Sequence, residues 1–85
     1  MRARVLVRPK AGILDPQGQA VERALPALGF DDVGHVRAGR SFDFDVEASD
    51  EASARARAAE LADRLLANPV IEQWELALTA SGTGP

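Results

Sequence analysis

The chain has 85 residues, with 13 Asp and Glu against 10 Lys and Arg, a net charge of −3 at pH 7, and no cysteine. Missing cysteine excludes disulfides, thiolate metal sites and cysteine catalysis. Scattered basic residues and few aromatic residues exclude the usual nucleic-acid surfaces.

A chain of this length forms one domain and buries roughly 60–65% of the surface that its unfolded form exposes. Its apolar fraction of 46% owes much to alanine, which buries little area. Oligomerisation is therefore expected from composition alone. The first ten residues contain no apolar signal segment, and no stretch approaches a membrane-spanning length, so we expect a cytoplasmic protein.

The predicted elements begin with a strand and a helix. Residues 2–8 alternate between alanine or valine on one face and arginine or leucine on the other. This pattern predicts a strand, which the following proline ends. Asp15 and Pro16 predict the start of a helix, because aspartate caps free N–H groups and proline suits the first turn. We expect Gly29 to end this helix, with a kink or an early end at Pro26. Its expected buried stripe comprises Ala20, Val21, Ala24, Leu25 and Leu28.

Strand character returns over residues 33–47, which Gly39 interrupts. The stretch is either one long strand with a bulge or a tight hairpin of two strands, and the sequence leaves both open. One expected face carries Phe42, Phe44 and Val46, and the other carries Ser41, Asp43, Asp45 and Glu47.

A second helix and a final strand complete the expected domain. Ser49 is expected to open the helix, acidic residues follow at its positive end, and Asn68-Pro69 ends it. Residues 71–78 predict a strand, so the domain spans residues 1–78 and residues 79–85 form a flexible tail. The expected apolar stripe of the helix comprises Ala54, Ala58, Leu61, Ala62 and Leu65.

This order predicts an α+β fold. We expect a two-layer sandwich with two helices on one face of a mainly antiparallel sheet of three or four strands, in the manner of a ferredoxin-like domain. Sheets are expected to pair on oligomerisation.

Three polar features are candidates for catalysis or for binding a metal or phosphate. His35 lacks a recognisable nucleophile and orienting carboxylate, so a partly exposed strand histidine is the better interpretation. The alternating acids of residues 43–47 are typical of a solvated strand face, and no glycine-rich calcium loop accompanies them. The arginines at positions 2, 4 and 8 could meet phosphate, but strand-edge charge or pairing with acids on the neighbouring strand explains them as well, and we prefer the structural interpretation. No catalytic residue and no metal ligand is predicted.

Two stretches are less ordinary. In residues 10–18, Gly18 weakens the first helical turn, which makes sense where a backbone or ligand approaches closely. In residues 65–72, a proline-rigidified corner presents Val70 and Ile71 at a loop, which suits an interface. Ordinary turn chemistry explains both stretches equally well.

Three ordered segments resemble the PurS family, the small subunit of phosphoribosylformylglycinamidine (FGAM) synthase. They are GILDPQG at 12–18, VRAGRSFDFDV at 36–46 and LLANPVIEQWEL at 65–76. The resemblance covers residues 3–78. It implies a purine-biosynthesis ligase complex, with glutamine as amide donor, in which a PurQ glutaminase releases ammonia and a PurL synthetase consumes it.

The resemblance also implies this chain's place in that complex. It would be a non-catalytic homodimer or dimer of dimers that joins the two enzymes and assists ammonia transfer. No cofactor is expected in this chain, since ATP and magnesium would belong to the large subunit. Residues expected to face the large subunit or the dimer mate are Lys10, Gly12, Leu14, Asp15, Gln17 and Gly18. Residues expected to project towards a partner are Arg37, Gly39 and Arg40. Residues expected at the other contact corner are Asn68, Pro69, Val70, Ile71 and Glu72.

A second hypothesis belongs to another class. The same order of elements is compatible with a dimeric ACT-like regulatory domain, in which an amino acid binds between paired sheets. Gly12 would then admit the backbone of the ligand.

Overall fold

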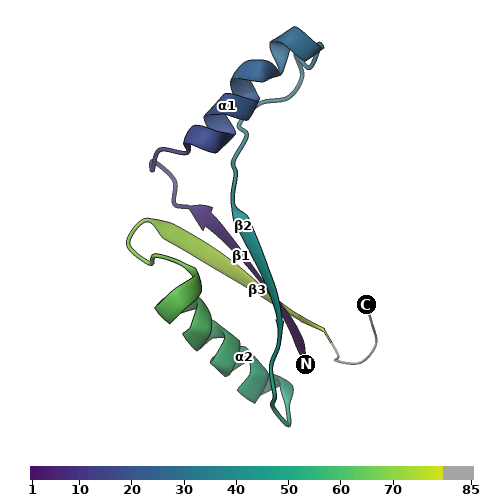
Figure 1. Ribbon diagram of the computed structural model, residues 1–85, viewed down its shortest axis with the longest axis vertical. Helices are drawn as coiled ribbons and strands as arrows, with labels where there is room; N and C mark the ends of the chain where they lie inside the picture. The colour runs from purple at the N-terminus through teal and green to yellow at the C-terminus, as the bar shows by residue number, and fades with distance from the viewer. Residues whose placement is uncertain (80–85) are drawn as a thin grey trace.

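The computed structural model describes residues 1–79 and contains three strands and two helices (Figure 1). The α+β class and the antiparallel sheet are confirmed. The last strand includes Thr79, one residue beyond the predicted domain boundary, and the rest of the predicted tail, residues 80–85, lies outside the described residues. The elements are β1 (Arg2–Pro9), α1 (Pro16–Ala24), a 3-10 turn (Pro26–Leu28), β2 (Arg40–Asp45), α2 (Glu51–Leu61), a π-helical turn (Ala62–Leu66) and β3 (Glu72–Thr79).

The sheet has the order β2-β1-β3, with β1 antiparallel to both neighbours. Val5, at the centre of β1, lies opposite Phe42 and Leu76. Beyond the end of β2, the Met1 ammonium donates to the Val46 carbonyl at 2.9 Å, and the Val46 N–H donates back to the Met1 carbonyl at 2.8 Å. The alternation read from residues 2–8 and 40–46 therefore sets one face of the sheet towards a core.

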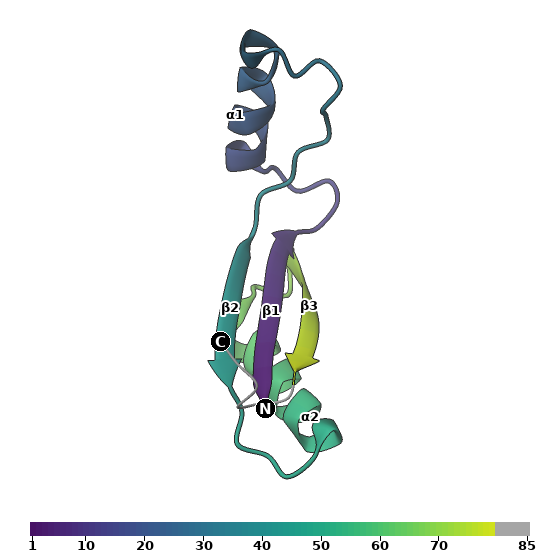
Figure 2. The ribbon, with the colours of Figure 1, turned by 90° about the vertical axis from the view of Figure 1, so that its right-hand side faces the viewer.

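The core lies between this face and α2 (Figure 2). Three alanines spaced four residues apart, Ala54, Ala58 and Ala62, are at most 1% exposed and let the helix approach the strands closely. On the sheet, Val5 and Val7 are equally buried and pack with Ala62. Small side chains on the helix thus set a short distance to the sheet, and most of the apolar area comes from the strands.

Two details of α2 differ from the sequence-based expectation. Asp50, rather than Ser49, caps the helix by accepting the Ser53 N–H at 2.7 Å. At the other end, Ala67 N–H donates to the Ala62 carbonyl, an i→i+5 bond of 3.0 Å. This π-helical turn holds one residue more than an α-helical turn, so the side chains that follow point in directions shifted by one position. As a result Leu65 is 74% exposed and Leu66 packs against the core instead.

The position of α1 corrects another expectation. Only α2 lies on the sheet, whereas α1 projects beyond the end at which β1 stops (Figures 1 and 2). Gly18 is the only buried residue of α1, so its predicted stripe is not buried within this chain. Val21 is 47% exposed and Leu28 is 70% exposed. The long axis of the molecule is accordingly 50 Å.

The conformation of residues 31–39 explains this displacement. They run on from β2 towards α1 without turning back, so the hairpin alternative is wrong. Regular strand pairing begins only at Arg40, and His35 interrupts an extended course with a positive φ of 54°. A chain that does not reverse at Gly39 carries α1 away from the sheet instead of back over it.

Candidate functional site

The two unusual stretches of the sequence meet at one end of the sheet. Because β1 is antiparallel to both neighbours, its end lies beside the starts of β2 and β3. Lys10 donates its backbone N–H to the Ile71 carbonyl at 2.9 Å and its Nζ to the Pro69 carbonyl at 2.7 Å. We call this region the junction, made up of Lys10, Arg37, Gly39, Arg40 and Asn68–Glu72.

A paired carboxylate and guanidinium hold the junction together. Arg40 donates from Nη1 and Nη2 to the two carboxylate oxygens of Glu72 at 2.8 and 2.9 Å, and from Nη2 to the Leu66 carbonyl at 3.0 Å. Glu72 also accepts the Asn68 N–H at 2.8 Å. The Arg40 hydrogen bonds, followed by the one from Asn68, lower the pKa of Glu72 below its ordinary value. The pair thus connects the starts of two strands with the end of the helical segment.

Asp15 fixes the base of α1 to the extended segment. Its side chain is only 9% exposed and accepts the Gly18 N–H at 3.0 Å and the Ala38 N–H at 2.8 Å. These hydrogen bonds, from Ala38 first and Gly18 second, lower its pKa, with a smaller contribution from the Arg37 guanidinium at 3.9 Å. The predicted helix cap is confirmed, and it serves as a link across 23 residues of chain as well.

The close approach predicted at Gly18 is confirmed, and the approaching backbone is the chain's own. A Cβ on Gly18 would lie 2.7 Å from the Val36 carbonyl oxygen and would collide with the Asp15 carboxylate. At Gly39, a Cβ would collide with the Val7 carbonyl oxygen. Gly12 has a φ of +85°, a conformation that favours glycine, but space is open around it.

The arginines at the junction bind within the chain. Arg37 donates from Nη2 to the Pro9 and Lys10 carbonyls at 2.9 and 3.2 Å, and Arg40 binds Glu72 as described above. These side chains therefore brace the junction through contacts within the chain, although both stay partly exposed. The exposed apolar residues of the predicted set are Leu14 at 67%, Val70 at 77% and Ile71 at 40%, and Gln17 is exposed as well.

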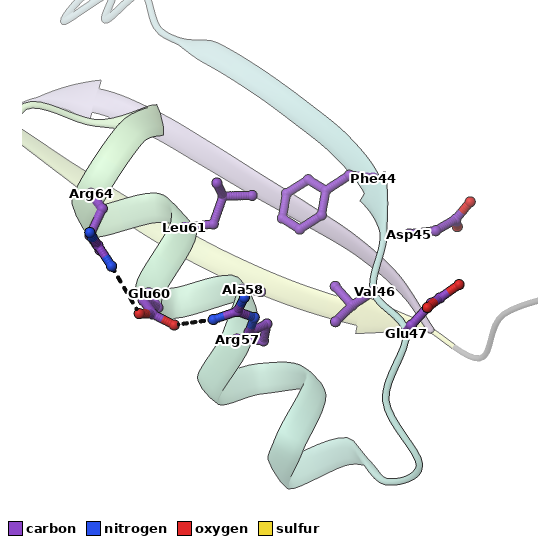
Figure 3. A pocket seen from close by; sticks show the side chains of 9 residues that line it. All are labelled: Phe44, Asp45, Val46, Glu47, Arg57, Ala58, Glu60, Leu61 and Arg64. Carbon is purple, nitrogen blue, oxygen red and sulfur yellow. Dashed lines mark hydrogen bonds and ion pairs between the residues drawn. The ribbon is translucent and has the colours of Figure 1, made fainter.

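Sequence reasoning missed a groove of about 570 Å³ between β2 and α2 (Figure 3). Its floor is apolar, and Glu60 on its rim accepts hydrogen bonds from Arg57 at 2.6 Å and Arg64 at 3.3 Å. These bonds lower the pKa of Glu60. The missed signal was the predicted inward face of β2, for which the alanines of α2 provide little cover. The lining residues are Phe44, Asp45, Val46, Glu47, Arg57, Ala58, Glu60, Leu61 and Arg64.

The remaining polar candidates have structural surroundings. Asp43 and Asp45 on the solvent face pair with Arg4 at 2.7 Å and Arg2 at 3.2 Å, as cross-strand partners should. Within residues 1–79 no group of three or more His, Cys, Asp or Glu side chains is placed to hold a metal ion. None of the helices in that range is both long and apolar enough to cross a membrane.

Comparisons with known proteins agree on one family. The family model described as "PurS: Phosphoribosylformylglycinamidine (FGAM) synthase" matches residues 2–80. The PurS subunit of Synechocystis sp. is 42% identical over 77 residues, which cover 91% of this chain and 77% of that one. The crystal structure of Methanocaldococcus jannaschii PurS has a TM-score of 0.79 at 36% identity and covers 89% of this chain and 92% of its own. A chain of the PurLQS structure from Thermotoga maritima has a TM-score of 0.82 at 29% identity, with 89% and 93% covered.

Proposed function

Since the chain belongs to the PurS family of FGAM synthase subunits, we propose that it joins a PurL-type synthetase to a PurQ-type glutaminase and assists the transfer of ammonia between them. The observation that carries this proposal is the match over residues 2–80, which runs from β1 through β3. The chain acts in the ligase as a non-catalytic subunit of an enzyme of purine biosynthesis, and the resemblance seen in the three sequence segments is confirmed.

The side chains support a subunit that binds proteins. The carboxylates of Asp15 and Glu72, whose pKa values are lowered, are both engaged by backbone N–H groups or by an arginine. Neither is therefore a free acid or base in contact with a catalytic partner among the described residues. Leu14, Val70 and Ile71 instead offer apolar area at the surface. We assign these three residues to contacts with the partner enzymes.

Three further parts of the proposal concern the complex. The chain carries no cofactor of its own, and ATP and magnesium are bound by the synthetase. It works in the cytoplasm. It associates with itself as a homodimer or a dimer of dimers, which the exposed apolar stripe of α1 supports.

The ACT-like alternative is not favoured. The relatives of this chain are named as PurS subunits, and the solved structures it resembles are PurS structures. Saturable binding of an amino acid to the isolated chain in a calorimeter would revive it.

Reconstitution tests the proposal. The synthetase and glutaminase are assayed for amidine formation with and without this chain, once with glutamine and once with ammonium chloride. We expect the chain to be required with glutamine and dispensable with ammonium chloride, because free ammonia needs no transfer. Equal glutamine-dependent rates without the chain would refute the proposal.

A matched pair of variants tests the assigned contacts. Val70→Glu places a charge at a side chain that is 77% exposed, and Leu65→Glu does the same at one that is 74% exposed. We expect only Val70→Glu to raise, by about tenfold or more, the concentration of chain needed for half-maximal activity, which corresponds to about 1.4 kcal/mol. Equal effects of the two variants would remove Val70 from the contact surface.

A further inference from the structure

Lys10 lies directly after β1 and is the only lysine of the chain. Its backbone N–H donates to the Ile71 carbonyl at 2.9 Å, and its Nζ donates to the Pro69 carbonyl at 2.7 Å. Its own carbonyl accepts a hydrogen bond of 3.2 Å from Arg37 Nη2. Lys10 therefore bonds both to residues 68–72, which we call the corner, and to the extended segment that follows α1.

Arg37 continues this series of contacts to the cap of α1. It also donates from Nη2 to the Pro9 carbonyl at 2.9 Å, and its Nε lies 3.9 Å from Oδ2 of Asp15. The next residue, Ala38, donates its N–H to the same oxygen at 2.8 Å. Asp15 in turn accepts the Gly18 N–H in the first turn of the helix. The contacts thus run without a break from the corner to the start of α1.

The connection through Lys10 is a single one. Among the described residues, Lys10 is the only one that is hydrogen-bonded both to the corner and to Arg37. The Glu72 side chain pairs with Arg40, which binds the Leu66 carbonyl, so that link ends in the sheet and the π-helical turn. Within residues 1–79 the Lys10 ammonium forms no ion pair. Its side chain is therefore held at the corner by one neutral carbonyl, a contact that a bound protein can reinforce.

The element at the other end of these contacts is easily opened. A helix of nine residues, such as α1, is too short to be stable in water by itself. Gly18 is its only buried residue, so within this chain its stability depends on polar contacts at its base more than on packing. Elements with so few buried contacts open locally at a much smaller free-energy cost than the sheet does. Local opening of α1 is thus an equilibrium that contacts at its base can shift.

We propose that Lys10 couples the corner to α1, so that a partner enzyme bound at the corner stabilises α1 and fixes the direction in which it projects. This inference rests on the corner as an enzyme contact in the proposed function. An enzyme packed on Val70 and Ile71 immobilises the Pro69 and Ile71 carbonyls, and these hold Lys10. The Lys10 carbonyl then holds Arg37 beside the cap. The coupling is reciprocal, because whatever stabilises α1 tightens binding at the corner by the same factor.

The first test uses the chain alone. Lys10→Met removes the ammonium and keeps the backbone bonds, and we expect it to accelerate amide exchange of residues 16–24 about threefold or more. Lys10→Arg retains a donor and should restore most of the protection. Arg55→Met removes an exposed cation of α2, distant from the corner, and should change nothing. Unchanged exchange in Lys10→Met would overturn the coupling. A loss of Trp74 fluorescence in that variant would also overturn it, because Lys10 would then support the sheet itself.

A double variant tests whether the contacts act in series. Arg37→Met removes the hydrogen bonds to the Pro9 and Lys10 carbonyls, and it should accelerate exchange in α1 by itself. Because Lys10 acts through Arg37, adding Lys10→Met to Arg37→Met should produce no further acceleration. Accelerations that multiply in the double variant would show two independent contacts, and the coupling would be wrong.

The third test adds the partner enzymes. Amide exchange of residues 16–24 is measured with saturating synthetase and glutaminase, and we expect it to slow about fivefold or more in the wild-type chain and clearly less in Lys10→Met. No slowing in the wild-type chain would overturn the coupling. Equal slowing in both chains would do so as well, because the enzymes would then cover α1 directly.

The reconstitution with glutamine separates the two proposals. A chain that is dispensable there refutes the proposed function, whatever the exchange measurements show. A chain that is required there, but whose α1 responds to the enzymes in the same way with and without the Lys10 ammonium, retains the proposed function and loses only the coupling.

Discussion

Both helices of this chain carry apolar residues at helical spacing, but the two stripes have different surroundings. In α2 the alanines of the stripe are at most 1% exposed against the sheet. In α1 the corresponding residues face solvent, and only Gly18 is buried. We call the sheet with α2 the body, and residues 10–39 the arm. The comparison shows that a helical pattern predicts which face of a helix must be covered, but not which surface covers it.

The two regions are also held together by different forces. The body relies on apolar packing, chiefly of Val5 and Val7 with Ala62. The arm is attached by directional contacts, chiefly the hydrogen bonds of Asp15 to Gly18 and Ala38. Loss of a few polar contacts should therefore release the arm while the body stays folded.

The largest expected effect comes from removing the same atoms in both regions. Val5→Ala leaves a cavity in the body and should lower the free energy of unfolding by about 2 kcal/mol. Val21→Ala, at a half-exposed position of the arm, should cost less than about 0.5 kcal/mol in dilute solution. Urea denaturation at low protein concentration measures both, and equal losses would contradict the contrast. A cost of Val21→Ala that grows with concentration would come from association.

The next effect is confined to the arm. Gly18→Ala brings a Cβ against the Val36 carbonyl and the Asp15 cap, and should destabilise α1 by roughly 1–2 kcal/mol. Amide exchange of residues 16–24 should accelerate, while fluorescence of the single tryptophan, Trp74 in β3, stays unchanged. Gly34→Ala is the control, because no atom lies within 4 Å of its added Cβ. Loss of the Trp74 signal in Gly18→Ala would show that the two regions fold as one.

Low pH should destabilise the arm before the body, and this effect should be smaller than the two above. The pKa of Asp15 is lowered in the folded chain by the Ala38 and Gly18 N–H groups. Its stabilisation is therefore complete above the ordinary aspartate pKa of about 3.9 and is lost as the pH falls through the lower folded value. Below pH 4, helical circular dichroism should fall before Trp74 fluorescence changes. Asp15→Asn should remove most of this difference between the pH values at which the two signals change. If the difference persists, the effect belongs to another carboxylate.

The smallest effect is expected on the solvent face of the body. Arg4 pairs with Asp43 across two strands, and both side chains are largely exposed. Arg4→Gln should leave Tm unchanged within the error of calorimetry, because exposed ion pairs contribute little. A clear fall in Tm that high salt abolishes would show that this charged face contributes to stability after all.

Much of the junction, and of the start of α1 beside it, could be predicted from the sequence because the signals are local. Asp15 followed by Pro16, Gly18 in a first helical turn, and Asn68-Pro69 each report the conformation of a few neighbouring residues. The hydrogen bonds that Arg37 and Arg40 make within the chain could not be predicted, since their partners are the Pro9 and Lys10 carbonyls and Glu72, which lie near them only in the folded chain. The groove was missed for the same reason.

By itself the sequence determined the order of strands and helices, the α+β class, the residues facing the core of the sheet, and the family. These features depend on periodicity, capping and segment order, which involve residues close together in the sequence. Only the tertiary structure decided that the chain stays open at Gly39, that α1 leaves the sheet, and that a π-helical turn sets Leu66 inward in place of Leu65. These choices depend on contacts between residues tens of positions apart, such as the Val7 carbonyl against Gly39. The local conformational propensity of a residue does not depend on contacts at that separation, so it cannot predict them.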